Sequence, residues 1–577
     1  MRFFFVVLSL ACALAASWGE SHWAFVSPVG AKVPESAVGS RSAIDAFVGL
    51  RGEVGPAADR RRLMRRVSLD LRGVPPTLME QEAFLADAHP MVLERLMDRW
   101  LASPRYGERM AQDWLDLARY ADTTGHAADQ PRTMWLYRDW VIDALNADLP
   151  FDQFTVEQLA GDRLPEATEA QKIATGFHRN SAQALGNNPR KEEFRVRGIV
   201  DRLDVTSQVW LGLSVACAEC HDHKHDPISQ KDYYRLFAIF NQVPHLGEKF
   251  NVRGPRMTVS RVVDGEAREV EAQIMGDVAE TRETFVHLRG SFEMPGERVE
   301  PGLPELFGGR RGMDRLGFTR WLVSEEHPLT ARVAVNRAWA HFFGRGLVAT
   351  ANDFGLHGER PTDPELLDWM AVRFRTGGWS MKRLHRDLMT SAAYQQSSAR
   401  RFRLSAEALR DQALAVSGLL VDQLGGPSVF PPQPEGVGQF RDATAGEWET
   451  SEGAGRYRRS LYTFWQRMAP HPAMTTFDAP SREWCTVTRM ATNTPLQALA
   501  MLNDPAMVEA QEAFARRLDA MPKSVRLSRG FQMALAREPR LEESKRWQAF
   551  LEKQKPEERT EILATVLFNL DEFLTRE

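Results

Sequence analysis

Apolar residues recur at helical spacing along most of the chain from Ala43 onward. The segment RRRLMRRVSLDLR, residues 60–72, has this spacing and precedes Gly-Val-Pro-Pro, which would end a helix. The spacing resumes in MEQEAFLADA and returns over three runs in the second half, Thr319–His341, Pro364–Arg375 and Met381–Ala393. We therefore predict a mainly α protein whose helices are separated by glycine and proline.

The pattern changes between about Pro255 and Gly309, where threonine, valine, glutamate and glycine mix with several prolines. Alternation over Thr284–Leu288 predicts a short strand followed by turns. We therefore expect two packed helical domains, residues 43–246 and 311–577, joined by a small β-containing connector, residues 247–310.

The first sixteen residues have the pattern of an export signal. Met1 and Arg2 precede an apolar run that ends with small residues at Ala13 and Ala15, as signal peptidase requires. A stretch rich in glycine, serine and proline follows, and we expect residues 17–42 to be flexible. No later apolar run reaches the roughly 18 residues that a membrane span needs, so we predict an exported protein, periplasmic or at the cell surface, without a transmembrane segment.

Half of the four cysteines and three of the fourteen histidines lie in VACAECHDHKHDPI, residues 215–228. Its core is a CxxCH motif formed by Cys217, Cys220 and His221. This motif attaches c-type haem: two thiols bond the porphyrin and the adjoining histidine becomes the iron ligand. The upstream residues that share the helical spacing of the cysteines are Leu203, Thr206, Trp210 and Leu213. We therefore expect one amphipathic helix to carry both thiols and His221 on one face.

Two other interpretations of the same segment stay open. Neighbouring cysteines in an oxidising compartment often form a disulfide. The segment also contains more than the four ligands that zinc or another divalent metal needs, namely Cys217, Cys220, His221, His223, His225 and Asp226. With such a metal site the protein would be a hydrolase or a surface binding protein, for example one that acts on polysaccharide. If haem binds, His223 and His225 are too close to His221 in sequence to reach the opposite haem face. A sixth iron ligand would then come from elsewhere or be absent.

The charge composition excludes two classes of binding partner. A net charge of −4 leaves no basic footprint for nucleic acid and no polybasic patch for a membrane surface. The chain has no GxSxG, HExxH or Walker-type loop, so an electron carrier and an enzyme both remain possible. The partner would be a redox protein or an extracellular substrate, which the sequence does not identify.

Polar residues elsewhere are further candidates for a site. In RYGERMAQDWLDLARYADTTGH, Asp113, Asp116 and Tyr120 share one helix face, which we expect to be a solvated face of carboxylates. In Met468–Asp504, polar residues lie among prolines and turns, where ordered loops often carry function. Thr494 before Pro495 predicts an N-cap with proline at the first helical position. The remaining candidates are Asp122, His178, Glu193, Asp478, Arg482 and Asn493.

Several segments closely resemble known family motifs. RVSLDLRGVPPT, RYGERMAQDWLDLARYADT, KIATGFHRN and CAECHDHKHDPIS are similar to the cytochrome-c-like domain of planctomycete surface proteins, over about residues 44–243. HPLTARVAVNRAWAHFFGRGLVATANDF and GWSMKRLHRDLMTSAAYQQSS resemble a C-terminal planctomycete surface domain. The resemblance implies one haem c at the single CxxCH. One departure is that relatives carry an acidic, glycine-rich stretch after GFHRN, whereas this chain keeps only Glu192 and Glu193 there.

Overall fold

The computed structural model describes residues 22–35, 42–50, 52, 55–125, 129–182, 191–243, 254–278, 280–436 and 448–577. The predicted signal peptide, residues 1–16, lies outside these ranges. Residues 22–35 belong to the segment predicted to be flexible, and they run along the second half of the chain. There Arg332 donates to the backbone oxygens of Trp23 and Val26, at 3.0 and 2.6 Å.

Short helices make up the first half, as the apolar spacing predicts. They are α2 Ala43–Gly49, α3 Arg60–Arg72, α4 Leu78–Ala86, α5 Val92–Leu101, α6 Pro104–Leu117, α7 Trp135–Asn146, α8 Phe151–Ala160, α9 Glu169–Ala174, α10 Lys191–Thr206 and α11 Gln230–Phe240. Helix α3 ends where Gly73 takes a left-handed φ of 70°, and Thr77 then begins α4 with a capping box.

The connector holds two antiparallel hairpins, β1 Arg256–Val263 with β2 Glu266–Gln273 and β3 Thr284–His287 with β4 Pro295–Val299. The predicted strand coincides with β3. Asp264 and Gly265 form the turn between β1 and β2, both with positive φ, because this two-residue turn matches the twist of the strands.

The second half is helical as well. Its elements are α12 Arg315–Leu322, α13 Thr330–Phe343, α14 Pro364–Thr376, α15 Met381–Thr390, α16 Ala392–Gln395, α17 Ala406–Ser417, α18 Pro472–Thr476, α19 Pro495–Asn503, α20 Pro505–Asp519, α21 Arg526–Leu535, α22 Leu541–Leu551, α23 Arg559–Asn569, α24 Asp571–Leu574 and the short strands β5 Phe402–Arg403 and β6 Thr575–Arg576. Thr494 caps α19 as predicted.

The single helix predicted over residues 319–341 is wrong, since α12 and α13 are separate. Pro328 has no N–H and disfavours helical backbone at the preceding residue. The His327 Nδ1 then accepts from the backbone N–H groups of Leu329 and Thr330, at 3.2 and 3.0 Å, where α13 begins.

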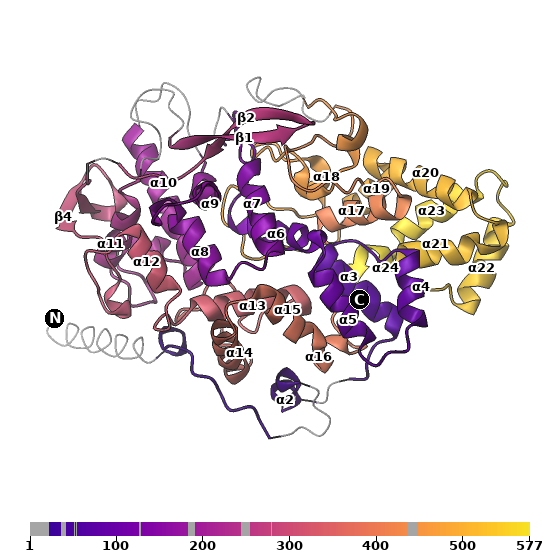
Figure 1. Cartoon of the computed structure of the whole chain (residues 1–577), viewed down its shortest axis with the longest axis horizontal. Helices are drawn as coiled ribbons and strands as arrows, with labels where there is room; N and C mark the ends of the chain where they lie inside the picture. The colour runs from indigo at the N-terminus through magenta and orange to yellow at the C-terminus, as the bar shows by residue number, and fades with distance from the viewer. Residues whose placement is uncertain are drawn as a thin grey trace, which may run out of the picture.

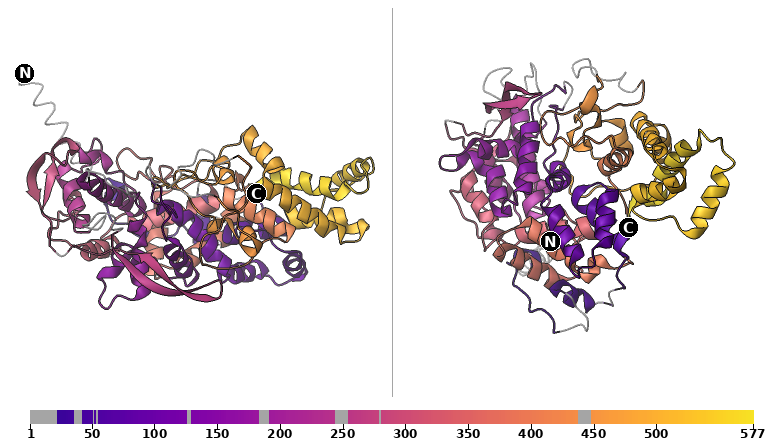
Figure 2. Two further views of the ribbon diagram at one scale, coloured as in Figure 1. Left: turned by 90° about the horizontal axis from the view of Figure 1, so that it is seen from above. Right: turned by 45° about the vertical axis from the view of Figure 1, so that its right-hand side comes forward.

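The two halves of the chain interleave and share one core. Figure 1 shows α13 to α16 of the second half lying below α6 to α8 of the first half, with α19 to α23 extending to the right. The buried apolar residues of both halves belong to one continuous cluster. The view from above in Figure 2 shows an elongated molecule, with the C-terminus between the two ends of its long axis. The mainly α prediction is confirmed.

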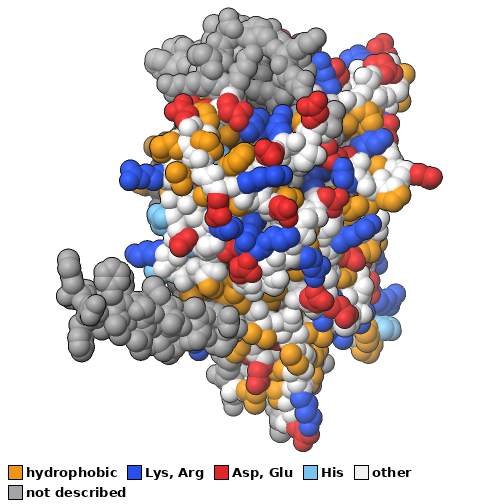
Figure 3. All heavy atoms as spheres, turned by 90° about the vertical axis from the view of Figure 1, so that its left-hand side faces the viewer, with side chains coloured by type: hydrophobic (Ala, Val, Ile, Leu, Met, Phe, Trp, Pro, Cys, Tyr) orange, Lys and Arg blue, Asp and Glu red, His pale blue; other side chains and the backbone are white. Residues whose placement is uncertain are grey.

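The surface carries a mixture of charges. On the face in Figure 3, acidic and basic side chains are interspersed, as the small net charge suggests. In the described part of the chain, no helix is both long enough and apolar enough to cross a bilayer.

Candidate functional site

The CxxCH motif does not lie on the long helix that its spacing predicted. Helix α10 ends at Thr206 and continues as one π-helical turn, Ser207–Leu211. Gly212 then takes a left-handed φ of 59° and ends the helix. The two thiols lie further on, Cys217 inside a short 3₁₀ helix, Ala216–Glu219, and Cys220 at its end.

A close approach between the halves explains this helix end. A Cβ on Gly212 would lie 2.8 Å from the ring of Phe354 and 2.9 Å from Val333, so only glycine fits there. The backbone N–H of Phe354 donates to the carbonyl of Gly212 at 2.8 Å. Packing against the second half of the chain therefore turns the backbone away from the helix axis before the motif begins.

All three residues of the motif are exposed. Cys217 and Cys220 are free thiols, so the structure contains no disulfide between them. The His221 Nδ1 lies 2.7 Å from the backbone oxygen of Asp222. If Nδ1 donates its proton to that oxygen, the lone pair of Nε2 remains for a ligand, which is the usual arrangement for a metal-binding histidine.

Neighbouring elements hold the motif backbone in place. Gln230 at the start of α11 donates to the carbonyl oxygens of Glu219 and His287, at 2.9 and 3.0 Å. Tyr234 also donates to the Glu219 carbonyl at 3.0 Å. Gly290, with a φ of 76°, packs so closely that a Cβ there would lie 2.7 Å from the Cys220 sulfur. The α11 helix and the β3–β4 loop thus fix the position of the second thiol.

The other predicted metal ligands interact with the backbone or with other side chains of the protein. His223 Nδ1 accepts from the backbone N–H of Asp226 at 2.8 Å and closes the loop. Asp226 is buried and accepts from the N–H of Leu356 at 2.7 Å, tying this loop to the second half. The His225 ring lies against His357, with 4.8 Å between centroids. Across the described residues, no three His, Cys, Asp or Glu side chains are grouped so that they could hold a metal ion.

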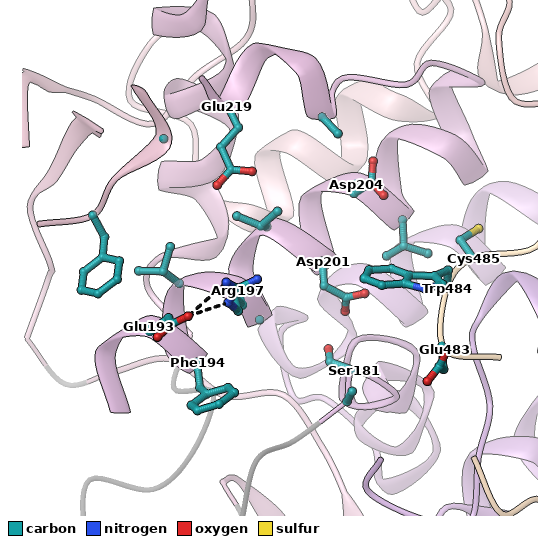
Figure 4. Close-up of a pocket in the computed structure, with 18 of the residues that line it drawn as sticks. Ser181, Glu193, Phe194, Arg197, Asp201, Asp204, Glu219, Glu483, Trp484 and Cys485 are labelled. Carbon is teal, nitrogen blue, oxygen red and sulfur yellow. Dashed lines mark hydrogen bonds and ion pairs between the residues drawn. The ribbon is translucent and has the colours of Figure 1, made fainter. Parts of the chain in front are cut away.

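A large cleft lies directly beside the motif. Its volume is about 1180 Å³, and Ala216 and Glu219 from the motif segment line it. The other walls come from α10, from residues 290–293 in the β3–β4 loop, and from residues 483–485 in the second half. Figure 4 shows Asp201 and Asp204 on α10, with Glu219 to one side and Trp484 and Cys485 to the other.

Several ionisable groups that line the cleft have shifted pKa values. Burial, as the largest cause, raises the pKa of Glu219. Burial, followed by repulsion from Asp201, raises the pKa of Asp204 to about 6. Burial likewise raises the pKa of the Cys485 thiol to about 12, so this third cysteine is a poor nucleophile at neutral pH.

The predicted solvated face on α6 is wrong for Asp116. This carboxylate is buried and accepts from Arg482 at 2.9 Å and from Arg489 at 2.5 Å. Asp113 is half exposed and pairs with Arg109 and His341. Tyr120 lies beyond the end of α6 and is also buried. The α6 carboxylates therefore join the two halves of the chain.

Two further candidates are buried structural groups. Asp122 accepts from the Tyr120 hydroxyl, the Ser428 hydroxyl and the Trp465 N–H, at 2.6, 3.0 and 2.8 Å, and burial raises its pKa. His178 is fully buried beside the ring of Phe240. Burial, followed by nearby arginines, holds its pKa well below the usual value, so the ring is neutral.

The candidates in the second half are dispersed. Asp478 pairs with Arg403 and accepts from Thr492, whereas Asn493 is exposed. Arg482 lies against the Trp465 ring, with its guanidinium carbon 4.0 Å from the ring centroid. Its buried bond to Asp116 anchors the segment that places Glu483 and Trp484 on the cleft. Of the candidates outside the motif, Glu193 lines the cleft itself, paired with Arg197 at 3.0 Å.

Sequence reasoning missed most of the cleft. Glu193, Arg197, Asp201 and Asp204 are spaced by four, four and three residues, so they lie along one face of α10. This row of charged residues at helical spacing could have been found in the sequence alone. The contributions of Phe292 and Trp484 depend on long-range contacts and had no local signal.

Two family models match the chain. Residues 44–245 match the model of PSCyt2, a protein family of unknown function (DUF1549), and residues 314–551 match PSD1, another family of unknown function (DUF1553). No curated protein and no solved structure matches the chain. The two matched regions fit the expected cytochrome-like domain and C-terminal surface domain. The chain therefore belongs with the proteins that combine the planctomycete PSCyt2 and PSD1 domains.

Proposed function

We propose that this chain is an exported redox protein that carries one c-type haem on Cys217 and Cys220, with His221 as an iron ligand. The observation that carries the proposal is the state of the CxxCH motif. Both thiols are free and exposed, and the His221 Nδ1 lies against a backbone carbonyl, which leaves Nε2 for the iron.

The donor set and its surroundings fit haem. The β3–β4 loop that packs on Cys220 through Gly290 also carries Leu288 and Met294, which are 49% and 45% exposed. Exposed apolar side chains on a loop that contacts one of the two thiols suit a flat apolar group. Haem c, when bound, supplies one-electron chemistry at its iron.

The chain's own residues have three roles in this proposal. The two cysteines hold the group covalently, and the Nδ1–H of His221 donates to the Asp222 carbonyl and so orients Nε2. Gln230 and Tyr234 fix the Glu219 carbonyl and keep the backbone between the thiols in one conformation. Export is part of the proposal, because haem is normally attached to CxxCH outside the cytoplasm. The alternative of zinc in a hydrolase or a surface binding protein, acting for example on polysaccharide, gains no support from the grouping of the described side chains.

The test is a pyridine haemochrome assay on denatured protein produced in a host that attaches haem c. Wild-type protein should retain haem after denaturation, because thioether bonds survive it. The double variant Cys217→Ser/Cys220→Ser should retain none. The matched control is Cys485→Ser, which removes the third described cysteine and should leave the signal unchanged.

Replacing His221 by alanine separates ligation from attachment. The variant should keep covalent haem while its absorption spectrum shifts, because the iron loses a nitrogen ligand. A wild-type protein that contains no haem, but binds one equivalent of zinc that the Cys217→Ser/Cys220→Ser variant loses, would contradict the proposal and favour the zinc site.

A further inference from the structure

Among the described side chains that line the cleft beside the motif, carboxylates outnumber guanidinium groups. Within the described residues, Glu219 and Glu483 both line the cleft, and neither carboxylate has a hydrogen bond or an ion pair. Asp204 accepts from Gln208 through Oδ2 at 2.8 Å, while its buried Oδ1 has no partner. These three groups leave acceptor oxygens facing the cleft.

The two arginines that line the cleft already have hydrogen-bond or ion-pair partners. Arg197 pairs with Glu193 at 3.0 Å on the same face of α10, as the dashed lines in Figure 4 show. Arg467 is buried and donates to the backbone oxygens of Arg119 and Asn180, both at 2.7 Å. Arg197 also attracts Glu219, and Arg467 attracts Glu483, through their charges. Among the described residues that line the cleft, however, seven carboxylates face two guanidiniums, so the site should favour a cationic ligand over an anionic one.

Aromatic side chains line the same cleft. Phe194 and Phe292 contribute from α10 and the β3–β4 loop, and Trp484 contributes from the second half with 73% of its surface exposed. An exposed indole beside free carboxylates binds flat apolar groups by stacking and binds cations through its ring face. The buried Arg482 precedes Trp484 by two residues and donates to Asp116. This bond anchors the segment that carries the tryptophan.

We propose that the cleft is a binding site for an organic cation, a protonated amine attached to a flat aromatic body. The ammonium group would lie near Asp204, with Glu219 and Glu483 adding negative charge from opposite sides of the cleft, and the flat body would lie against Trp484. The inference does not rest on haem attachment, because the cleft is lined by Ala216 and Glu219 rather than by the two thiols. If haem is attached, the ligand would lie beside the segment that carries it.

Isothermal titration of the full mature chain with three indoles tests the charge requirement. The probes are tryptamine (a cation), indole-3-ethanol (neutral) and indole-3-propionate (an anion). Tryptamine should bind about tenfold more tightly than the neutral probe, since a hydrogen-bonded charged group is worth roughly that factor, and the anion should not bind. Equal affinity for the neutral and cationic probes would overturn the proposal, as would tighter binding of a neutral oligosaccharide such as cellohexaose.

Substitutions of residues that line the cleft test whether the probe binds there. Glu219→Gln and Glu483→Gln should each weaken tryptamine severalfold without changing the affinity for indole-3-ethanol, and Trp484→Ala should weaken both. Glu561→Gln, at an exposed position on α23, is the control and should change neither. Unchanged tryptamine affinity in both glutamine variants would overturn the assignment. Repeating the titration with Cys217→Ser/Cys220→Ser separates this outcome from that of haem attachment, since binding should persist.

A pH series adds a second readout. Because the pKa of Asp204 is about 6, its carboxylate loses its charge as the pH falls from 7.5 to 5, and tryptamine should bind more weakly at the lower pH. The groups that interact with Asp204 from surrounding elements are Asp201, Arg119, Glu219, Tyr233 and Cys485. Asp204→Asn should flatten this part of the profile. A profile identical to that of the wild type would contradict a role for Asp204 in cation binding.

Discussion

Asp116 lies at the centre of a buried ion network that joins the two halves of the chain. It accepts from Arg482 and Arg489, and Arg489 also reaches Glu407 with two nitrogens, at 2.7 and 2.8 Å. A buried pair of this kind adds little net stability by itself, but removing one partner leaves the other charged and desolvated. The carboxylate therefore acts in folding and in anchoring the cleft wall.

Replacing Asp116 by alanine should lower the free energy of unfolding by about 3–5 kcal/mol, because Arg482 loses the carboxylate that balances its charge. Urea denaturation measures the change. The neighbouring Asp113→Asn, on the same helix but half exposed, should cost less than about 1 kcal/mol. Equal effects of the two substitutions would contradict the buried network.

The three described cysteines should differ sharply in reactivity. In protein made without haem attachment, iodoacetamide at pH 8 should alkylate Cys217 and Cys220, which are exposed. Cys485 should stay unmodified until the chain is unfolded, because burial raises its pKa to about 12 and leaves almost no thiolate. Peptide mass spectrometry distinguishes the sites, and rapid labelling of Cys485 in native protein would refute this description.

At the scale of elements, the end of the α10 segment at Gly212 decides where the motif lies. A left-handed residue there lets the chain pass between Phe354 and Val333 before the 3₁₀ helix begins. The thiols therefore lie on a short exposed segment beside the cleft, in contact with the β3–β4 loop, instead of on a helix face.

Gly212→Ala should destabilise the fold by more than the roughly 1–2 kcal/mol that a left-handed alanine costs, because the new Cβ would also clash with Phe354 and Val333. Gly265→Ala is the matched control: its φ of 81° is also positive, but nothing lies within 4 Å of the added atom. Chemical denaturation of both variants separates backbone strain from the clash. A smaller effect at Gly212 than at Gly265 would argue against the close approach.

Local pattern was sufficient for several helices and insufficient for the site. Apolar spacing and stop signals located α3, α4, α14 and α15, and α3 and α14 end at Gly73 and Gly377. The helix end at Gly212 was not predictable, since it depends on Phe354, more than a hundred residues later. The same holds for the cleft, which needs Trp484 beside α10. CxxCH was recognisable because its chemistry is local.

At the scale of the whole molecule, the C-terminal segment contacts helices of both halves of the chain. Arg576 is buried and donates to both oxygens of Asp70 in α3 and to the carbonyl of Phe342 in α13. Strand β6 pairs with β5 beside this contact. Because both halves also share one continuous core, they should unfold together.

Calorimetry should therefore show one cooperative transition for the mature chain, and Arg576→Met should shift it downward as a whole. We expect a loss of about 3–5 kcal/mol, because Asp70 stays buried without its guanidinium. Arg516→Ala, at an exposed pair with Glu512, is the control and should change stability by less than about 1 kcal/mol. Two resolved transitions in the wild type would contradict the shared core.

The central claim is that the CxxCH segment of this protein holds haem covalently. The most direct measurement is the intact mass of the mature, denatured chain after expression with haem attachment. The account predicts a mass increase equal to one haem per chain, which disappears in Cys217→Ser/Cys220→Ser and persists in Cys485→Ser. A wild-type mass equal to that of the unmodified polypeptide, from cells that attach haem to another CxxCH protein in the same experiment, would contradict the claim.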